Sequence, residues 1–257
     1  MRFLKGHGTE NDFVLLPDPD GSLLLTSELV RRLCDRRAGL GADGVLRVVP
    51  TAKEPDGADY VGEAAWFMDY RNADGSVAEM CGNGVRVYAR YLVMEGLADE
   101  GALRLATRGG IKDVRVEGDA ITVDMGQAVV GETLTIDGMP AVAVDMGNPH
   151  AVVHVASVAA LGELDPERKD LNVEYVQDVG PAHLTMRVHE RGVGETRSCG
   201  TGACAAVVAA VLRTGEPRGS AYTVDVPGGQ LVVTWQEDGH VLLTGPAVLV
   251  AEGVWTG

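Results

Sequence analysis

Short stretches in which apolar and polar residues alternate occur along much of the chain. Examples are IKDVRVEG (111–118), AITVDM (120–125), LTMRVHE (184–190) and QLVVTW (230–235). A period of two predicts strands with one buried face, mostly in antiparallel sheets. Two further stretches are apolar over a helical length, and each ends at a glycine suited to a helix C-cap: VRVYARYLVMEG (85–96) and ACAAVVAAVLRTG (203–215).

The same order of elements occurs twice. Each predicted helix is followed by a strand-like run, a Gly-Gly pair and a hairpin, and a turn containing asparagine opens each half. We therefore predict an α/β (α+β) fold with two pseudo-symmetric domains, in which a curved sheet buries each central helix. The predicted domains are residues 1–125 and 126–257, and the last few residues can pack back on the first half.

Composition excludes several classes of protein. The chain has 257 residues with 46% apolar content, enough to bury one large core or two modest ones. A formal charge of −15 argues against a nucleic-acid partner, and no basic run indicates an anionic membrane. No apolar stretch is long enough to span a bilayer, and the N-terminus lacks the apolar core of a signal peptide. We expect a soluble cytoplasmic protein.

Two of the four cysteines lie in one repeated motif. Cys81 is in MCGNG (80–84) and Cys199 is in SCGTG (198–202), and each motif opens a predicted helix. Backbone N–H groups and the positive end of the dipole at a helix N-terminus favour a thiolate. Two such cysteines suggest two bases on opposite faces of one carbon. The other two, Cys34 and Cys204, lie on apolar helical faces and are expected to be packing residues.

The exposed N–H groups of these turns form anion sites suited to a substrate carboxylate. They belong to Gly82, Asn83, Gly200 and Thr201. The loop ERGVGET (190–196) follows the strand before Cys199 and could hold a substrate that carries both an ammonium and a carboxylate group. The loop begins with the charged pair Glu190-Arg191. An adjacent Glu-Arg pair usually lies on the surface, but this pair is in a glycine-rich loop close to a cysteine motif.

Asparagines and one histidine accompany the motifs. Turn chemistry explains most asparagines at such places, and a lone histidine is more often structural. Their grouping around the cysteine turns nevertheless indicates ligand contacts. The residues are Asn11, Asn72, Asn83, Asn148, Asn172 and His150. No pyridoxal-binding lysine constellation and no metal-ligand spacing is evident, so neither a cofactor nor a metal is expected.

Along nearly its full length the chain resembles diaminopimelate epimerase. The resemblance rests on HGTENDFV (7–14), GLGADG (39–44), YRNADGS (70–76), MCGNGVR (80–86), GNPH (147–150), NVEYVQ (172–177), ERGVGET (190–196) and SCGTGACA (198–205). It implies two domains, each an antiparallel barrel-like sheet around a central helix. It also implies pyridoxal-independent epimerisation of LL-diaminopimelate to meso-diaminopimelate, in lysine and cell-wall precursor biosynthesis, by a homodimer.

The resemblance assigns roles to residues. Cys81 would donate and Cys199 accept a proton in the LL-to-meso direction. The N–H groups named above would bind the reacting carboxylate, and His150 would assist catalysis together with Glu190. The remaining substrate contacts would come from Asn11, Asn72, Asn148, Asn172, Glu190 and Arg191. One position departs from the pattern: some relatives carry Gln where this chain has Gly44, so any side-chain contact there is lost.

Three alternatives compete with this interpretation. A proline or hydroxyproline racemase also uses two cysteines, but the Glu190–Arg191 loop and the asparagines favour a substrate with a second, distal amino-acid group. A thiol redox switch would pair Cys81 with Cys199, yet it has no need of two anion-binding turns. A non-catalytic binding module is the third, and turnover of LL-diaminopimelate by the reduced protein discriminates among them.

Overall fold

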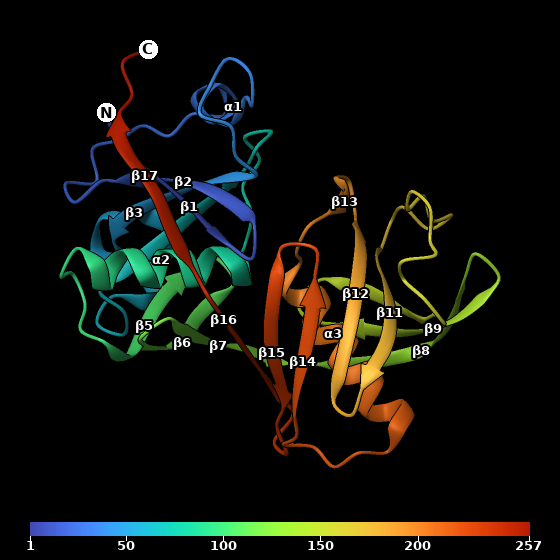
Figure 1. Cartoon of the computed structure of the whole chain (residues 1–257). Coiled ribbons are helices and arrows are strands. Elements are labelled where there is room, and N and C mark those ends of the chain that lie inside the picture. Colours follow the sequence, from blue (N-terminus) through green and yellow to red (C-terminus); the bar gives the residue numbers. More distant parts are fainter. The chain divides into compact units, whose positions relative to one another are not determined.

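The computed structural model describes every residue from Met1 to Gly257. The chain folds into two compact units, Met1–Val123 together with Pro246–Gly257, and Asp124–Gly245 (Figure 1). Each unit is a twisted sheet that packs around one long helix. None of the helices combines the length and the hydrophobicity that crossing a bilayer demands.

In the first unit the strands pair in the order β17-β1-β2-β3-β4-β5-β6-β7. Neighbours are antiparallel except for the parallel pairs β2–β3 and β4–β5. The elements are β1 (Arg2–Gly8), β2 (Asn11–Pro17), α1 (Ser27–Cys34), β3 (Gly44–Pro50), the 3-10 helices η1 (Thr51–Lys53) and η2 (Pro55–Tyr60), β4 (Trp66–Asn72), α2 (Gly82–Met94), β5 (Gly101–Thr107), β6 (Gly110–Glu117), β7 (Ala120–Gln127) and β17 (Val248–Val254).

The second unit repeats this plan. Its strands pair in the order β8-β9-β10-β11-β12-β14-β15-β16, again with two parallel pairs, β10–β11 and β12–β14. The short strand β13 pairs with the end of β12. The elements are β8 (Val129–Ile136), β9 (Met139–Asp145), β10 (Pro149–His154), β11 (Asn172–Gly180), β12 (His183–Glu190), β13 (Gly194–Thr196), α3 (Gly200–Thr214), β14 (Ala221–Val226), β15 (Gly229–Trp235) and β16 (His240–Gly245).

The two units share one succession of parallel and antiparallel pairings, which confirms the predicted pseudo-symmetry. The parallel pairs are a feature that the alternating pattern did not predict. Two of them, β4–β5 and β12–β14, arise because a long helix connects the two strands, and a crossover of that length returns the chain in the same direction. In the first unit the strand that corresponds to β8 is β17, which comes from the C-terminal end of the chain.

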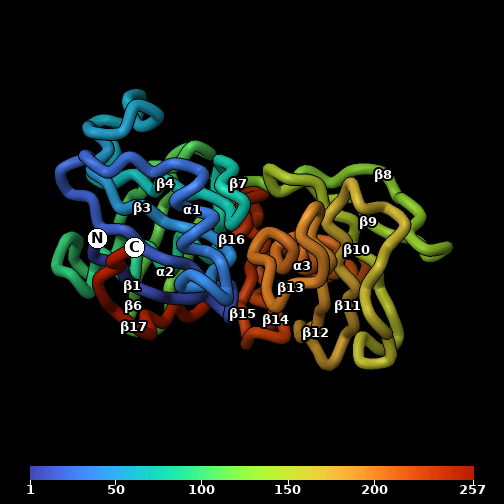
Figure 2. Tube along the Cα trace, turned by 90° about the horizontal axis from the view of Figure 1, so that it is seen from above, coloured from blue at the N-terminus to red at the C-terminus, as the bar shows by residue number.

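Each long helix is the core of its unit. Helix α2 contacts β1, β2, β3, β4, β6 and β17, and α3 contacts most strands of its own sheet (Figure 2). Most residues of α3 are alanine or valine, and all of these are buried. Their small side chains let the backbone of the surrounding strands approach the helix closely. The predicted glycine ends are confirmed: Gly215 caps α3 in a left-handed conformation, and Gly96 follows the last residues of α2 with φ 67°. Cys34 and Cys204 are both buried, as predicted.

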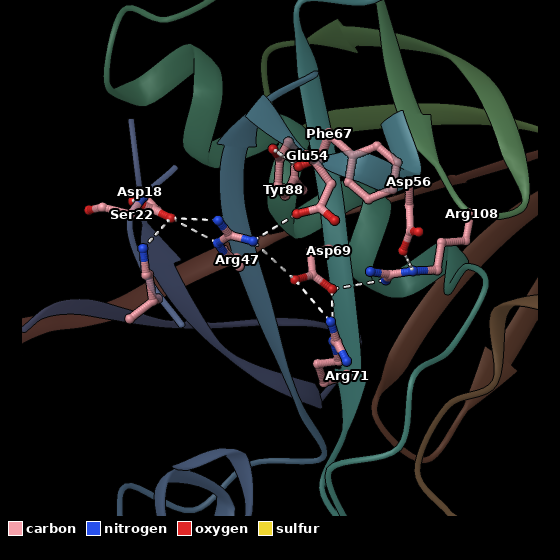
Figure 3. Close-up of polar contacts among 11 residues, drawn as sticks. Asp18, Ser22, Arg47, Glu54, Asp56, Phe67, Asp69, Arg71, Tyr88 and Arg108 are labelled. Carbon is pink, nitrogen blue, oxygen red and sulfur yellow. Dashed lines mark hydrogen bonds and ion pairs between the residues drawn. The ribbon is translucent and has the colours of Figure 1, made fainter. Parts of the chain in front are cut away.

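A buried ionic network stabilises the sheet of the first unit (Figure 3). Arg47 on β3 binds Asp18 at 2.8 Å and Glu54 at 2.7 Å, and Asp69 on the neighbouring strand β4 lies 3.5 Å away. The Asp69 side chain is 1% exposed. Burial would raise the pKa of Asp69, but its ion pairs with arginines hold that pKa below the ordinary value.

Candidate active site

Cys81 lies at the N-cap of α2, where its thiol contacts Asn11. Its Sγ is 3.6 Å from Oδ1 of Asn11, and Nδ2 of Asn83 donates to the same oxygen at 3.2 Å. Asn11 begins β2, and Asn83 belongs to the first turn of the helix. The structure therefore brings Asn11, from a distant turn, to the motif that contains Cys81 and Asn83.

Asp43 fixes the orientation of the Asn11 amide. Nδ2 of Asn11 donates to an Asp43 carboxylate oxygen at 2.7 Å, which turns Oδ1 toward the thiol. Arg36 in turn binds Asp43 at 2.6 Å and Asp12 at 2.7 Å. Asp43 lies in the GLGADG stretch on which the resemblance partly rests, but no sequence signal indicated this role.

The turn before Cys81 is attached to the ionic network. The Gly109 N–H donates to the carbonyl of Glu79 at 3.1 Å, two residues before the cysteine. Its neighbour Arg108 binds Asp69 at 2.9 Å and Asp56 at 2.6 Å (Figure 3). The guanidinium also lies over a phenylalanine ring, 5.5 Å from its centroid. Buried charges thus help to place the backbone that leads to Cys81.

Asn72 forms hydrogen bonds inside its own turn. Its Nδ2 donates to the Ser76 hydroxyl at 2.9 Å, and its backbone N–H donates to the Ser76 carbonyl at 3.0 Å. The Ser27 hydroxyl, at the start of α1, donates to the Gly75 carbonyl of this turn at 2.9 Å. The amide oxygen of Asn72 is not used in these bonds, so it remains an acceptor for a ligand.

Tyr70 occupies the space beside Gly44. A Cβ atom at position 44 would lie 2.6 Å from the Arg71 carbonyl oxygen and 2.7 Å from Cε2 of Tyr70. The Tyr70 ring also packs edge-on against Phe13, with 5.9 Å between ring centroids. A longer side chain at position 44 therefore has no room, because the Tyr70 ring fills the space beside it.

Cys199 lies at the N-cap of α3 in the second unit and is buried. The Gly202 N–H donates to its Sγ at 3.4 Å, and Oγ1 of Thr201 is also 3.4 Å from the sulfur. Burial raises the pKa of Cys199 well above its ordinary value. The negative charges of Glu190 and Glu174 raise it further, and these effects outweigh the two hydrogen bonds. The hydrogen bonds at the helix end lower the pKa of Cys199, as expected, but by less than burial and the two glutamates raise it.

Glu190 is the carboxylate beside this thiol. It ends β12, and the hairpin to β13 brings the Thr196 hydroxyl to its Oε1 at 2.5 Å. Burial raises the pKa of Glu190; hydrogen bonds from Thr196 and Cys199 lower it, and the charge of Glu174 raises it. A carboxyl group with a raised pKa next to a thiol with a raised pKa can exchange a proton with it.

His150 is linked to Cys199 through two side chains. Its Nε2 is 3.0 Å from Oδ1 of Asn148, and Nδ2 of Asn148 donates to Oγ1 of Thr201 at 3.4 Å. Thr201 then contacts Sγ of Cys199. On the other side, Nδ1 of His150 is 2.7 Å from Oε1 of Glu174. His150, Asn148 and Thr201 were predicted site residues, whereas Glu174 was not.

Asn172 connects two loops of the second unit. Its Nδ2 donates to the carbonyl of Pro149 at 3.0 Å, and its Oδ1 accepts from the backbone N–H of Arg191 at 3.0 Å. The Arg191 side chain is exposed. Asn172 thereby places the start of the loop that carries Glu190 and Arg191, and the guanidinium is free to meet a ligand.

The two cysteine clusters have the same design. Each has a cysteine at a helix N-cap, backbone N–H groups of a Gly-containing first turn, and asparagine side chains from strand ends. Such a cluster can bind a carboxylate and can give or take one proton at sulfur. No group of three or more histidine, cysteine, aspartate or glutamate side chains is arranged to hold a metal ion.

Comparisons at the level of sequence agree on one family. The family model for diaminopimelate epimerase matches residues 3–131 and 142–250. The diaminopimelate epimerase of Streptomyces coelicolor is 55% identical over 276 aligned positions, covering 98% of this chain and 94% of that protein. The enzyme of the same name from Thermobifida fusca is 51% identical, with 98% and 97% covered.

Solved structures show the same fold at low sequence identity. A phenazine biosynthesis protein of the PhzF family from Bacillus anthracis superposes with a TM-score of 0.77, covering 98% of both chains at 16% identity. Similarity at this level describes the fold alone and carries no information about the reaction.

Proposed function

The chain belongs to the diaminopimelate epimerase family of isomerases, and from this premise we propose that it interconverts LL- and meso-diaminopimelate with two acid/base thiols. The observation that supports this most is the repeated cluster: one helix N-cap cysteine in each unit, each beside an anion-binding turn. Inversion at a carbon requires a base on one face and an acid on the other, and two equivalent thiols meet that need.

In the LL-to-meso direction, Cys199 takes the α-proton and Cys81 delivers a proton to the opposite face. The Cys199 thiol must first lose its own proton, and Glu190, hydrogen-bonded to it, is the base that accepts this proton. The thiolate then removes the substrate proton while the Cys81 thiol protonates the carbanion. The reverse reaction exchanges the roles of the two sulfurs.

The helix ends stabilise the charge that develops in this step. Removal of an α-proton beside a carboxylate places negative charge on the carboxylate oxygens. Backbone N–H groups of Gly82, Asn83, Gly200 and Thr201 are donors for those oxygens, and the positive ends of the helix dipoles add to the effect. Asn11 and Asn148, which already contact the clusters, complete the recognition of the reacting end.

The distal end of the substrate carries a second ammonium and carboxylate group. We assign its recognition to the exposed guanidinium of Arg191, the carboxylate of Glu190, and the amides of Asn72 and Asn172. No cofactor is part of this proposal. As the family resemblance implies, the proposed reaction belongs to lysine and cell-wall precursor biosynthesis and takes place in the cytoplasm. The proposed active form is a homodimer.

Turnover tests the proposal directly. The reduced protein, dialysed against EDTA, is mixed with LL-diaminopimelate, and formation of the meso isomer is followed by chiral chromatography. We expect epimerisation that chelation does not diminish. Turnover of proline or trans-4-hydroxyproline in place of diaminopimelate would support the racemase alternative, and loss of activity on chelation that metal restores would contradict the cofactor-free mechanism.

A further inference from the structure

Glu174 is a charged residue at a position where the strand pattern calls for an apolar one. It lies in β11 between Val173 and Tyr175, and its side chain is fully buried. Oε1 contacts His150, but Oε2 has no hydrogen-bond partner in the protein. A buried carboxylate oxygen without a partner is costly, so a carboxylate kept at such a place calls for an explanation beyond packing.

The fold makes room for this carboxylate at the N-terminal end of α3. A Cβ atom at Gly202 would lie 2.6 Å from Oε1 of Glu174, so only glycine lets the carboxylate come so close to the first turn of the helix. The parallel register pairs His150 with Asn172 and Val152 with Glu174, so Glu174 lies two residues along β11 from the partner of His150. Both the helix and the strand register therefore direct Glu174 to the imidazole.

The contact fixes where one imidazole proton lies. An ionised Glu174 can only accept, so with this side chain as a carboxylate the proton at the 2.7 Å contact lies on Nδ1 of His150. This holds for either orientation of the Asn148 amide, whose oxygen and nitrogen can exchange places. Nε2 is consequently directed at Asn148, the first link toward Thr201 and Cys199.

We propose that Glu174 is a positioning residue that acts on Cys199 through His150, by holding the ring with Nδ1 protonated and Nε2 turned to Asn148. The proposal rests on the two-thiol function proposed above. Glu174 itself touches no substrate: it orients the hydrogen-bonded series that ends at the sulfur. A neutral side chain of the same shape would keep the volume but lose the strong acceptor.

The first test is Glu174→Gln, which preserves size. We expect kcat to fall roughly tenfold to a hundredfold with KM nearly unchanged, since the substrate contacts are intact. The matched control is Glu132→Gln, an exposed glutamate on β8 of the same unit, which should leave both constants unchanged. Wild-type kinetics in Glu174→Gln would overturn the proposal.

A double-mutant cycle shows whether the effect passes through the histidine. In a His150→Asn background the loss caused by Glu174→Gln should shrink to within about twofold, because the group on which Glu174 acts is gone. A full, multiplicative loss in that background would overturn the proposal, since it would mean that Glu174 acts by another route.

Nuclear magnetic resonance of ¹⁵N-histidine-labelled protein gives a readout that needs no turnover. His150, assigned by its loss in His150→Asn, should show a protonated Nδ1 whose proton resonance moves upfield in Glu174→Gln. An unprotonated Nδ1, or a resonance unchanged by the substitution, would overturn the proposal. Because this measurement is independent of activity, failure of the positioning role is distinguishable from failure of the proposed reaction.

A second variant reaches the same carboxylate without altering it. Gly202→Ala places a methyl group against Oε1 of Glu174 and should displace it from His150. Alanine favours the helix, so this variant keeps the fold available if Glu174→Gln does not fold. We expect the same movement of the His150 Nδ1 proton resonance; its absence in folded Gly202→Ala would count against the contact that carries the inference.

Discussion

The surroundings of Cys199 favour the thiol over the thiolate. Burial and two nearby carboxylates raise its pKa well above the ordinary value, and the helix end offsets this only in part. Because the pKa is raised, the thiolate fraction is small at neutral pH and grows as pH increases toward that pKa. A thiol with a raised pKa reacts slowly with oxidants, and in the proposed mechanism its proton passes to Glu190.

Alkylation as a function of pH tests this state. In Cys81→Ala protein without substrate, iodoacetamide should modify Cys199 slowly at pH 7, and the rate should rise about tenfold per pH unit up to pH 9. Peptide mass spectrometry separates Cys199 from Cys204, whose side chain is fully buried and serves as the internal control. Rapid alkylation with no pH dependence would contradict the raised pKa.

Arg191 provides the second prediction at the residue scale. Arg191→Lys keeps the positive charge but loses the planar pair of donors that binds a carboxylate. We expect kcat/KM for diaminopimelate to fall by about tenfold or more, which is about 1.4 kcal/mol. Arg168→Lys, an exposed arginine of the same unit, is the control. Near-normal kinetics would place Arg191 outside the substrate site.

The third prediction at the residue scale concerns Gly44. Restoring the glutamine found in some relatives, by Gly44→Gln, should destabilise the protein by about 1–3 kcal/mol, because Tyr70 and the Arg71 carbonyl leave no room for a Cβ atom. Denaturant unfolding measures the change, with Gly162→Gln in open surroundings as the control. Unchanged stability would mean that the strand shifts easily to admit the side chain.

Residue types and their spacing indicated the candidate residues of the site but not its internal contacts. The cysteines, the asparagines and His150 are visible because they lie in turns and repeated motifs. Asp43 and Glu174 are not, since their partners are distant in the sequence and only the strand register brings them together. A charged residue inside a buried strand, as at Glu174, was the one available signal.

Among the elements, the buried ionic network leads to the fourth prediction. Asp69→Asn removes the buried carboxylate that Arg108 and Arg71 share; Arg108 keeps its ion pair with Asp56, whereas Arg71 loses its ion-pair partner. We expect a loss of about 3 kcal/mol in the free energy of unfolding at pH 7. Asp113→Asn, at an exposed ion pair, should change it little.

The pH dependence of that loss has a definite sign. The folded-state pKa of Asp69 is lowered, so its stabilisation is present above the unfolded pKa of about 3.9 and is lost as pH falls through the lower folded value. The difference between wild type and Asp69→Asn should therefore shrink when unfolding is measured below about pH 4. A difference that is constant down to pH 2 would show that the carboxylate charge is not the cause.

Elements were predicted unequally well. The two central helices and the alternating strands follow from periodicity, because burial of one face requires it. The parallel pairs β2–β3 and β10–β11 could not be predicted from periodicity, because the alternation of apolar and polar residues is the same in parallel and antiparallel strands. Periodicity also did not predict the pairing of β17 with β1, which joins the two ends of the chain. At this junction Met1 and Trp255 exchange backbone hydrogen bonds at 2.9 and 2.8 Å.

For the whole molecule, the repeat is the most informative property. Two units with one order of strand pairings each present a helix N-cap cysteine. Duplication of the same chemical cluster explains why a single fold can supply an acid and a base of the same type. The central claim is therefore that each sulfur serves one face of the substrate carbon.

Hydrogen exchange during the first turnovers tests that claim most directly. With unlabelled LL-diaminopimelate in D₂O, the meso product formed early should carry deuterium at the inverted carbon, while recovered LL substrate carries little. This follows because the donor thiol exchanges with solvent before each turnover and the abstracted proton stays on the other sulfur. Product that retains the original hydrogen, or substantial epimerisation by Cys199→Ala protein, would contradict the two-thiol mechanism.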